Sequence, residues 1–295
     1  MNTYEEIKTQ NKCQEMYAMF YNLSINIIER CGKKTGEGII RRAVRKSGEN
    51  LGRSILKEHR NAGIKTNLHN LYNYGLNILF DPRTRIEKIF DFEDRQNFEV
   101  HTCPFAQYHN IRGQGKIGSF FCDEFQYAVV RAYTENYGQL NLSKMMTYEN
   151  DNFCCVSAYF RPANTSKQRA KESFSSCSPL SDLIPEEINY KNTFSNLEQF
   201  MVNLYCHMYN EAVEKCENEG ACAIADGLKS WVKEAISMME KQAANTKVQY
   251  NEDFARLNFP LSLNRESNIN WNFDTTGKAK EIMETLVLNT ILTTF

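Results

Sequence analysis

The chain has 295 residues, of which 42% are hydrophobic and 24% charged, an ordinary globular mixture that excludes wholesale disorder. Its 35 Lys and Arg residues balance 36 Asp and Glu residues to a net charge of −1, whereas a dedicated nucleic-acid binder carries a basic surplus. No run of about 18 apolar residues occurs, and residues 1–6 lack a secretory leader, so we expect a cytoplasmic protein without a membrane span.

The predicted elements begin with helices over the first eighty residues. Apolar residues recur there at three- and four-residue steps, from Tyr17 to Ile28, and the pattern breaks at Gly32 and at residues 36–38. Residues 86–92 and 98–103 alternate as strands do, and Pro104 ends the second run. A loop over 113–118 and a helix over 120–133 follow, and residues 145–160 hold another pair of alternating runs.

This order of elements predicts an α+β fold, with helical layers packed on a small, mostly antiparallel sheet. We expect a first unit over residues 1–160, a connector rich in Ser and Pro over 161–192, and a helical part over 193–295. The last part repeats features of the first, since residues 29–31 correspond to 214–216 and Gly36 to Gly220. We therefore hypothesise an internal duplication whose second copy has Thr276 in place of Cys103.

Ten cysteines are the unusual feature of the composition, because disulfides rarely persist in the cytosol. Side chains two residues apart on a strand share a face, so the spacing predicts that His101 and Cys103 lie together and that the histidine lowers the thiol pKa. The alternative is that each cysteine only packs in the core. The densest group of reactive residues lies in the strand-rich middle of the chain: His101, Cys103, Cys122, Asp123, Asp151, Cys154 and Cys155.

A zinc site is a second interpretation of this group. Its tetrahedral ligands would be His101, Cys103, Cys122 and either Cys154 or Cys155. The sequence lacks the C-x-x-C pair that structural zinc sites use, so we assign no metal ligand and expect no cofactor. The glycines of residues 113–118 do not form a phosphate-binding loop, and His109 and the remaining histidines are expected to be surface or satisfied residues.

Three short motifs resemble the L-2-amino-thiazoline-4-carboxylic acid hydrolase family over residues of about 15–160. They are Cys103-Pro104 at a strand end, Phe121-Cys122-Asp123 at a helix start, and Asp151-Asn152-Phe153-Cys154 before a strand. Asn150 stands where the family usually has glycine. The chain is more distantly similar to small-molecule-binding domains of the vinyl-reductase type.

The resemblance implies hydrolytic opening of a cyclic isothiourea at a carbon–nitrogen bond. Cys103 would attack the carbon between nitrogen and sulfur, His101 would act as base, and Asp123 or Asp151 would orient the histidine. Cys122 is an alternative nucleophile, and Asp151 and Cys154 are expected to contact the substrate.

Two other functions stay open. One is a biosynthetic enzyme that acts on an amide, a thioamide or a carrier-bound substrate, and the other is a sensor module for a small ligand or zinc. In each case we expect a small-molecule partner, with no nucleic acid and no membrane, and the oligomeric state is left open.

Overall fold

The computed structural model describes residues 4–76, 81–148, 151–177, 197–263 and 270–295. Its contacts separate into two compact units, one formed by residues 1–43 and 197–295 and the other by residues 44–196. The sequence predicted three consecutive segments, 1–160, 161–192 and 193–295. That division of the chain stays a prediction. Among the described residues, no helix is long and apolar enough to cross a membrane.

The first unit is helical. It contains α1 (Tyr4–Cys31), the start of α2 (Lys33–Asn61), the long α7 (Leu197–Thr246), α8 (Glu252–Asn258), α9 (Lys278–Met283), the π-helix η7 (Glu284–Leu288) and α10 (Asn289–Leu292). Helix α1 packs along α7 with a buried stripe that includes Phe20, Leu23 and Ile27. Gly227 of α7 permits this approach, because a Cβ there would lie 2.9 Å from the Cα of Leu23.

The turn between α1 and α2 is made by one residue, Gly32, at a left-handed φ of 79° that glycine adopts without strain. The predicted break at residues 36–38 is wrong, because these residues lie inside α2. Glu217, at φ 46° and ψ −121°, interrupts the helical backbone of α7. The apolar periodicity therefore located these helices, while the positions of their ends depended on single backbone angles.

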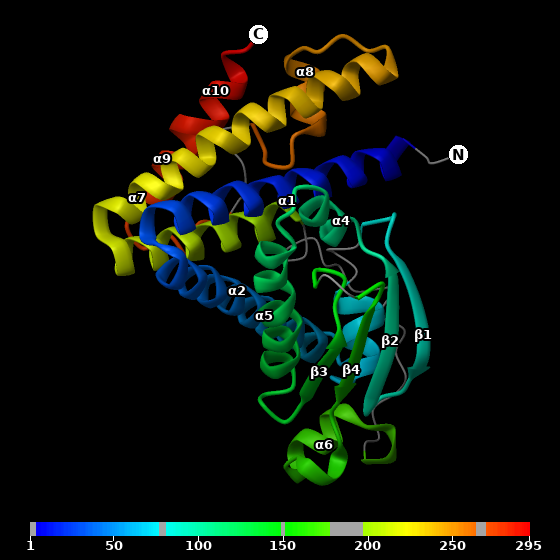
Figure 1. Ribbon diagram of the computed structural model, residues 1–295. Helices are drawn as coiled ribbons and strands as arrows, with labels where there is room; N and C mark the ends of the chain where they lie inside the picture. Colours follow the sequence, from blue (N-terminus) through cyan, green and yellow to red (C-terminus); the bar gives the residue numbers. More distant parts are fainter. Residues whose placement is uncertain (1–3, 77–80, 149–150, 178–196, 264–269) are drawn as a thin grey trace. The chain divides into compact units, whose positions relative to one another are not determined.

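The second unit combines the rest of α2 with a sheet. It contains α3 (Leu68–Asn70), η1 (Leu71–Gly75), β1 (Arg85–Asp91), β2 (Arg95–Thr102), α4 (Pro104–Ile111), α5 (Gly115–Tyr133), β3 (Gln139–Lys144) and β4 (Cys154–Tyr159). The strands are ordered β1-β2-β4-β3 and every pair is antiparallel. Figure 1 shows the four strands with α5 beside β3. The predicted α+β class with a small antiparallel sheet is confirmed.

The two faces of the sheet differ in character. Phe98, Val100 and Val156 are buried on the inner face, where Cys103 and Cys154 pack against them. Residues at the alternate positions point to the outer face, because successive side chains of a strand point to opposite sides. On β2 these are partly buried or exposed polar residues, among them Glu99 and His101.

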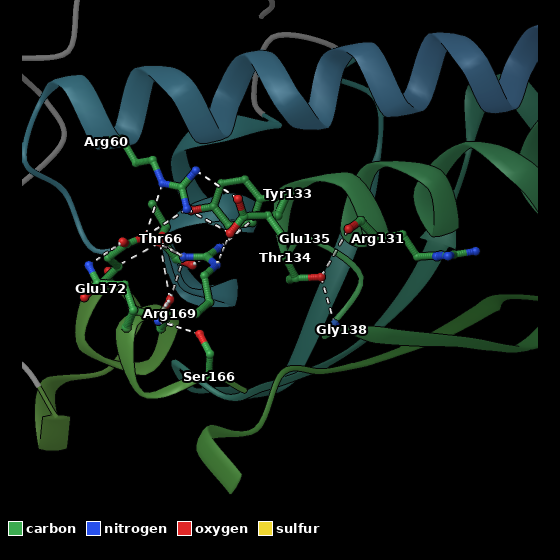
Figure 2. Close-up of polar contacts among 12 residues, drawn as sticks. Arg60, Thr66, Arg131, Tyr133, Thr134, Glu135, Gly138, Ser166, Arg169 and Glu172 are labelled. Carbon is green, nitrogen blue, oxygen red and sulfur yellow. Dashed lines mark hydrogen bonds and ion pairs between the residues drawn. The ribbon is translucent and has the colours of Figure 1, made fainter. Parts of the chain in front are cut away.

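The predicted connector begins with three short helices: η3 (Pro162–Asn164), which is a 3-10 helix, α6 (Lys167–Ser173) and η4 (Ser175–Cys177). Residues 178–196 lie outside the described residues. Figure 2 shows how α6 is attached. The buried guanidinium of Arg169 donates to the backbone carbonyl of Tyr133 at 2.9 Å, to Ser173 and to Thr66, and pairs with Glu135 at 3.0 Å. This one side chain therefore connects α6 to the end of α5 and to the residues that follow α2.

Candidate active site

Cys103 lies where a strand becomes a helix. Strand β2 ends at Thr102, and Cys103 is the N-cap of α4, with Pro104 in the first helical turn. The backbone N–H of Ala106 donates to the Cys103 Sγ at 3.4 Å. A helix N-terminus presents unpaired N–H groups and a positive dipole end, which favour negative charge. The thiol of Cys103 is thus held where a developing thiolate would be stabilised.

Three thiols from three elements come together here. Cys103 before α4, Cys122 on α5 and Cys154 at the start of β4 are all partly buried free cysteines. Charge on Cys103 or on Cys154 raises the pKa of Cys122, so the three groups lie close enough for ionisation of one to oppose ionisation of the others. The motifs quoted for Cys103, Cys122 and Cys154 therefore meet in space, although 51 positions separate the first from the last.

All three thiols are held in the neutral form. Burial raises the pKa of Cys103 to about 11, and the N–H groups of Ala106 and Phe105 offset only part of this effect. Burial also raises the pKa of Cys122 and of Cys154, and the N–H of Met146 donates to the Cys154 Sγ at 3.3 Å. The cluster is therefore a set of protonated thiols, and a thiol needs a base or a nearby cation before it reacts as a thiolate.

His101 is not part of this cluster. The expectation that His101 and Cys103 share a strand face is wrong, because the strand ends between them and Cys103 turns to the inner face with Val100. The imidazole of His101 lies on the outer face, where its Nε2 is 3.3 Å from the Oε2 of Glu99 and 3.4 Å from that of Glu87.

The two aspartates predicted to orient His101 have other contacts. Asp123 accepts a hydrogen bond from the Tyr148 hydroxyl at 3.1 Å, and Asp151 accepts one from the backbone N–H of Met145 at 2.8 Å. Their charges still act on the thiols, since Asp123 raises the pKa of Cys122 and Asp151 raises that of Cys154. The carboxylates therefore border the cluster on the sides of Cys122 and Cys154.

Four further residues, not selected from the sequence, lie beside a thiol or beside a residue that neighbours one. The Thr147 side chain neighbours Cys122, and Asp81 is close enough to raise the pKa of Cys103. Tyr72 packs edge-on against Phe98 and buries its hydroxyl. None of these three residues stands in one of the quoted motifs, so only the Cys-Pro signature of a helix start pointed to their surroundings.

His109 is the fourth, and it is buried on α4. Its Nδ1 is 2.9 Å from the carbonyl of Phe105, so Nδ1 carries the proton and Nε2 the lone pair. Burial lowers the pKa of His109 to about 4, which keeps the ring neutral at pH 7. A Cβ at Gly118 would lie 3.1 Å from both the His109 ring and the Thr147 side chain, so Gly118 brings these two groups together.

A surface cavity of this unit lies away from the thiols. It has a volume of about 660 Å³ and is lined by residues of α2, α5 and the turn after α5, among them Arg53, Lys57 and Arg131. Its arginines pair with neighbouring glutamates, for example Arg60 with Glu135 at 2.8 Å. None of the three thiols lines it, so the chemistry of the cysteines and this charged cavity are separate features.

The family model for L-2-amino-thiazoline-4-carboxylic acid hydrolase matches residues 12–159, which is 148 of the 295 residues. The chain belongs to this family. The match runs from α1 to the last residue of β4 and includes all three clustered thiols, and the family's name indicates a hydrolase. Comparisons with curated proteins and with solved structures gave no match.

Proposed function

We propose that this family member is a cysteine-dependent hydrolase that opens a small, cyclic, thiazoline-like substrate at a carbon–nitrogen bond. The observation that carries the proposal is the position of Cys103, whose thiol caps α4 within a cluster of three thiols. Backbone N–H groups at that position stabilise charge on sulfur and cost no reorganisation during the reaction. We assign Cys103 the role of nucleophile, with Cys122 as the alternative.

The chemistry follows from the electrophilic carbon between nitrogen and sulfur in a cyclic isothiourea. The Cys103 thiol adds across its C=N bond, with the thiol proton passing to the ring nitrogen. The ring carbon–nitrogen bond then breaks and the amine leaves. Water adds to the same carbon, and Cys103 departs as a thiol. The step consumes one water and needs no cofactor.

The electrostatics of the cluster support a cationic substrate. A protonated isothiourea carries a delocalised positive charge, and such a charge beside Cys103 lowers the thiol pKa from its resting value of about 11. The carboxylates of Asp123 and Asp151 border the same cluster, and their negative charges favour a positively charged substrate there. We propose that these aspartates and Cys154 contact the substrate, and that binding itself activates the nucleophile.

The proposed base is a different histidine from the one predicted from the sequence. His101 lies on the outer face with Glu87 and Glu99, whereas His109 is buried beside Thr147 and is neutral at pH 7. A neutral imidazole with its lone pair on Nε2 can accept a proton. We therefore propose His109 as the base that assists the attacking water, while the thiol proton passes to the ring nitrogen.

The test is turnover of 2-amino-thiazoline-4-carboxylate, followed by mass spectrometry as the gain of one water. Replacement of Cys103 by Ser should lower the rate at least 100-fold. The matched control is Cys222→Ser on the exposed side of α7, which should leave the rate unchanged. Full turnover by the Cys103 variant, together with loss in Cys122→Ser, would move the nucleophile to Cys122. No turnover by the unmodified protein would refute the substrate class.

A further inference from the structure

The outer face of the sheet carries a group of ligand atoms that the proposed reaction does not use. Glu87 of β1 stands directly opposite Glu99 of β2 in the antiparallel ladder, and His101 follows two residues later on the same face. One nitrogen of His101 and one oxygen from each glutamate all lie within 4.8 Å of one another. Among the described residues, this is the one such group of three or more His, Cys, Asp or Glu side chains.

We propose that Glu87, Glu99 and His101 bind a divalent transition-metal ion of the Zn²⁺ class on the outer face of the sheet. Metal–ligand bonds of about 2.0–2.2 Å place two tetrahedral ligand atoms about 3.3–3.6 Å apart. The His101 Nε2 lies 3.3 Å from the Glu99 Oε2 and 3.4 Å from the Glu87 Oε2, so both spacings fall in this range. Two carboxylates and an imidazole are ligands that zinc accepts.

The cross-strand pair supports a cation between its members. Like charges directly opposite each other destabilise an antiparallel ladder, yet Glu87 and Glu99 occupy such a position. An ion bound by both carboxylates removes this repulsion and joins the edge strand β1 to β2. Strand β1 has few buried residues of its own, so it gains most from such a connection.

The surroundings hold the imidazole in place. The Phe153 ring packs against the His101 ring with centroids 5.7 Å apart, and Lys144 lies over Phe153 at 4.2 Å. The ammonium group of Lys144 thus contacts the aromatic ring. Its presence lowers the affinity for a metal but leaves the ligand atoms facing one another.

The group has three ligand atoms, and the proposed fourth ligand is Cys155 on the next strand. It is the ladder partner of Glu99 in β4, so the two side chains share the outer face with Cβ atoms about 5 Å apart. A thiolate there would complete a tetrahedral set, and a water molecule would do so otherwise. The site is separate from the three thiols of the inner face and does not depend on the proposed hydrolase activity.

The experiment is a titration of metal-free protein with ZnCl₂ by calorimetry, repeated with Co²⁺, whose visible absorption reports tetrahedral coordination. We expect one ion per chain, and a Kd at least tenfold higher in Glu87→Gln and in His101→Ala. Glu214→Gln, an exposed glutamate of α7, is the matched control and should bind as the unmodified protein does. Circular dichroism confirms that each variant is folded.

The outcomes separate the alternatives. Unchanged binding in both Glu87→Gln and His101→Ala would overturn the proposal, because the ion would then lie elsewhere, for example at the inner thiols. Absence of binding below millimolar Zn²⁺ would also overturn it. Loss of the near-ultraviolet Co²⁺–thiolate band in Cys155→Ser, with Co²⁺ still bound, would identify Cys155 as the fourth ligand, and an absent band in the unmodified protein would identify water.

Discussion

Replacement of Gly52 by Ala tests the close contact between α2 and α5. A Cβ at Gly52 would lie 2.5 Å from the carbonyl oxygen of Val129 and 3.0 Å from the Cβ of Ala132. One turn earlier, a Cβ at Gly48 would lie 2.7 Å from the carbonyl oxygen of Phe125. The backbones of the two helices are therefore in direct contact over two glycines, and α5 carries Cys122.

The expected loss of stability follows from the steric overlap of the new methyl group with α5. Ordinary van der Waals contact begins at 3.4 Å, so the helices must separate by roughly 0.9 Å to admit the methyl group at Gly52. Such overpacking costs about 1–3 kcal/mol, and a backbone carbonyl cannot move aside as a side chain can, which favours the upper half of that range. Alanine improves the helix propensity by about 1 kcal/mol, so the net loss is about 1–2 kcal/mol.

Urea unfolding followed by circular dichroism measures this loss. Arg53→Ala is the matched control, because it is the next residue of α2 and its side chain is 57% exposed. Its free energy of unfolding should change by less than about 0.5 kcal/mol, since an exposed ion pair contributes little. The reasoning is refuted if Gly52→Ala is as stable as the unmodified protein, because α2 and α5 would then not be in backbone contact.

Three further predictions concern buried groups. Arg169→Lys should reduce the free energy of unfolding by about 3 kcal/mol, because an ammonium cannot reproduce the forked bonds to Tyr133 and Glu135; a loss below about 1 kcal/mol in urea would contradict this. Burial raises the pKa of Glu15 to about 8 from 4.5, so stability should be full below pH 4.5 and fall as pH rises to 8. Unfolding curves at pH 5 and 8.5 should differ less in Glu15→Gln than in the unmodified protein, and an equal difference would argue against a buried carboxyl. Because burial raises the pKa of Cys103 to about 11, its alkylation rate should climb about tenfold per pH unit from pH 7 to 10, whereas a plateau below pH 9 would show an already activated thiolate.

Much of the fold could be predicted from local patterns. Alternation predicted strands at 86–92 and 98–103, and the structure has them at Arg85–Asp91 and Arg95–Thr102. The helix predicted over 120–133 starts earlier, at Gly115, because the glycine-rich stretch taken for a loop forms its first turn. Glycine lowers helix propensity but does not forbid a helix when tertiary contacts support it.

For the candidate site, the sequence and the tertiary structure each determined a different part. The sequence by itself determined the family and the α+β class, because the Cys-Pro pair, the later Cys and Asp motifs and the apolar periodicity are local patterns. Only the tertiary structure decided that Cys103 turns inward as a helix cap while His101 faces outward, since a change of backbone conformation between residues 102 and 104 ends the two-residue alternation. The meeting of Cys103 with Cys122 and Cys154 likewise required contacts among three elements distant in sequence, which no local pattern encodes.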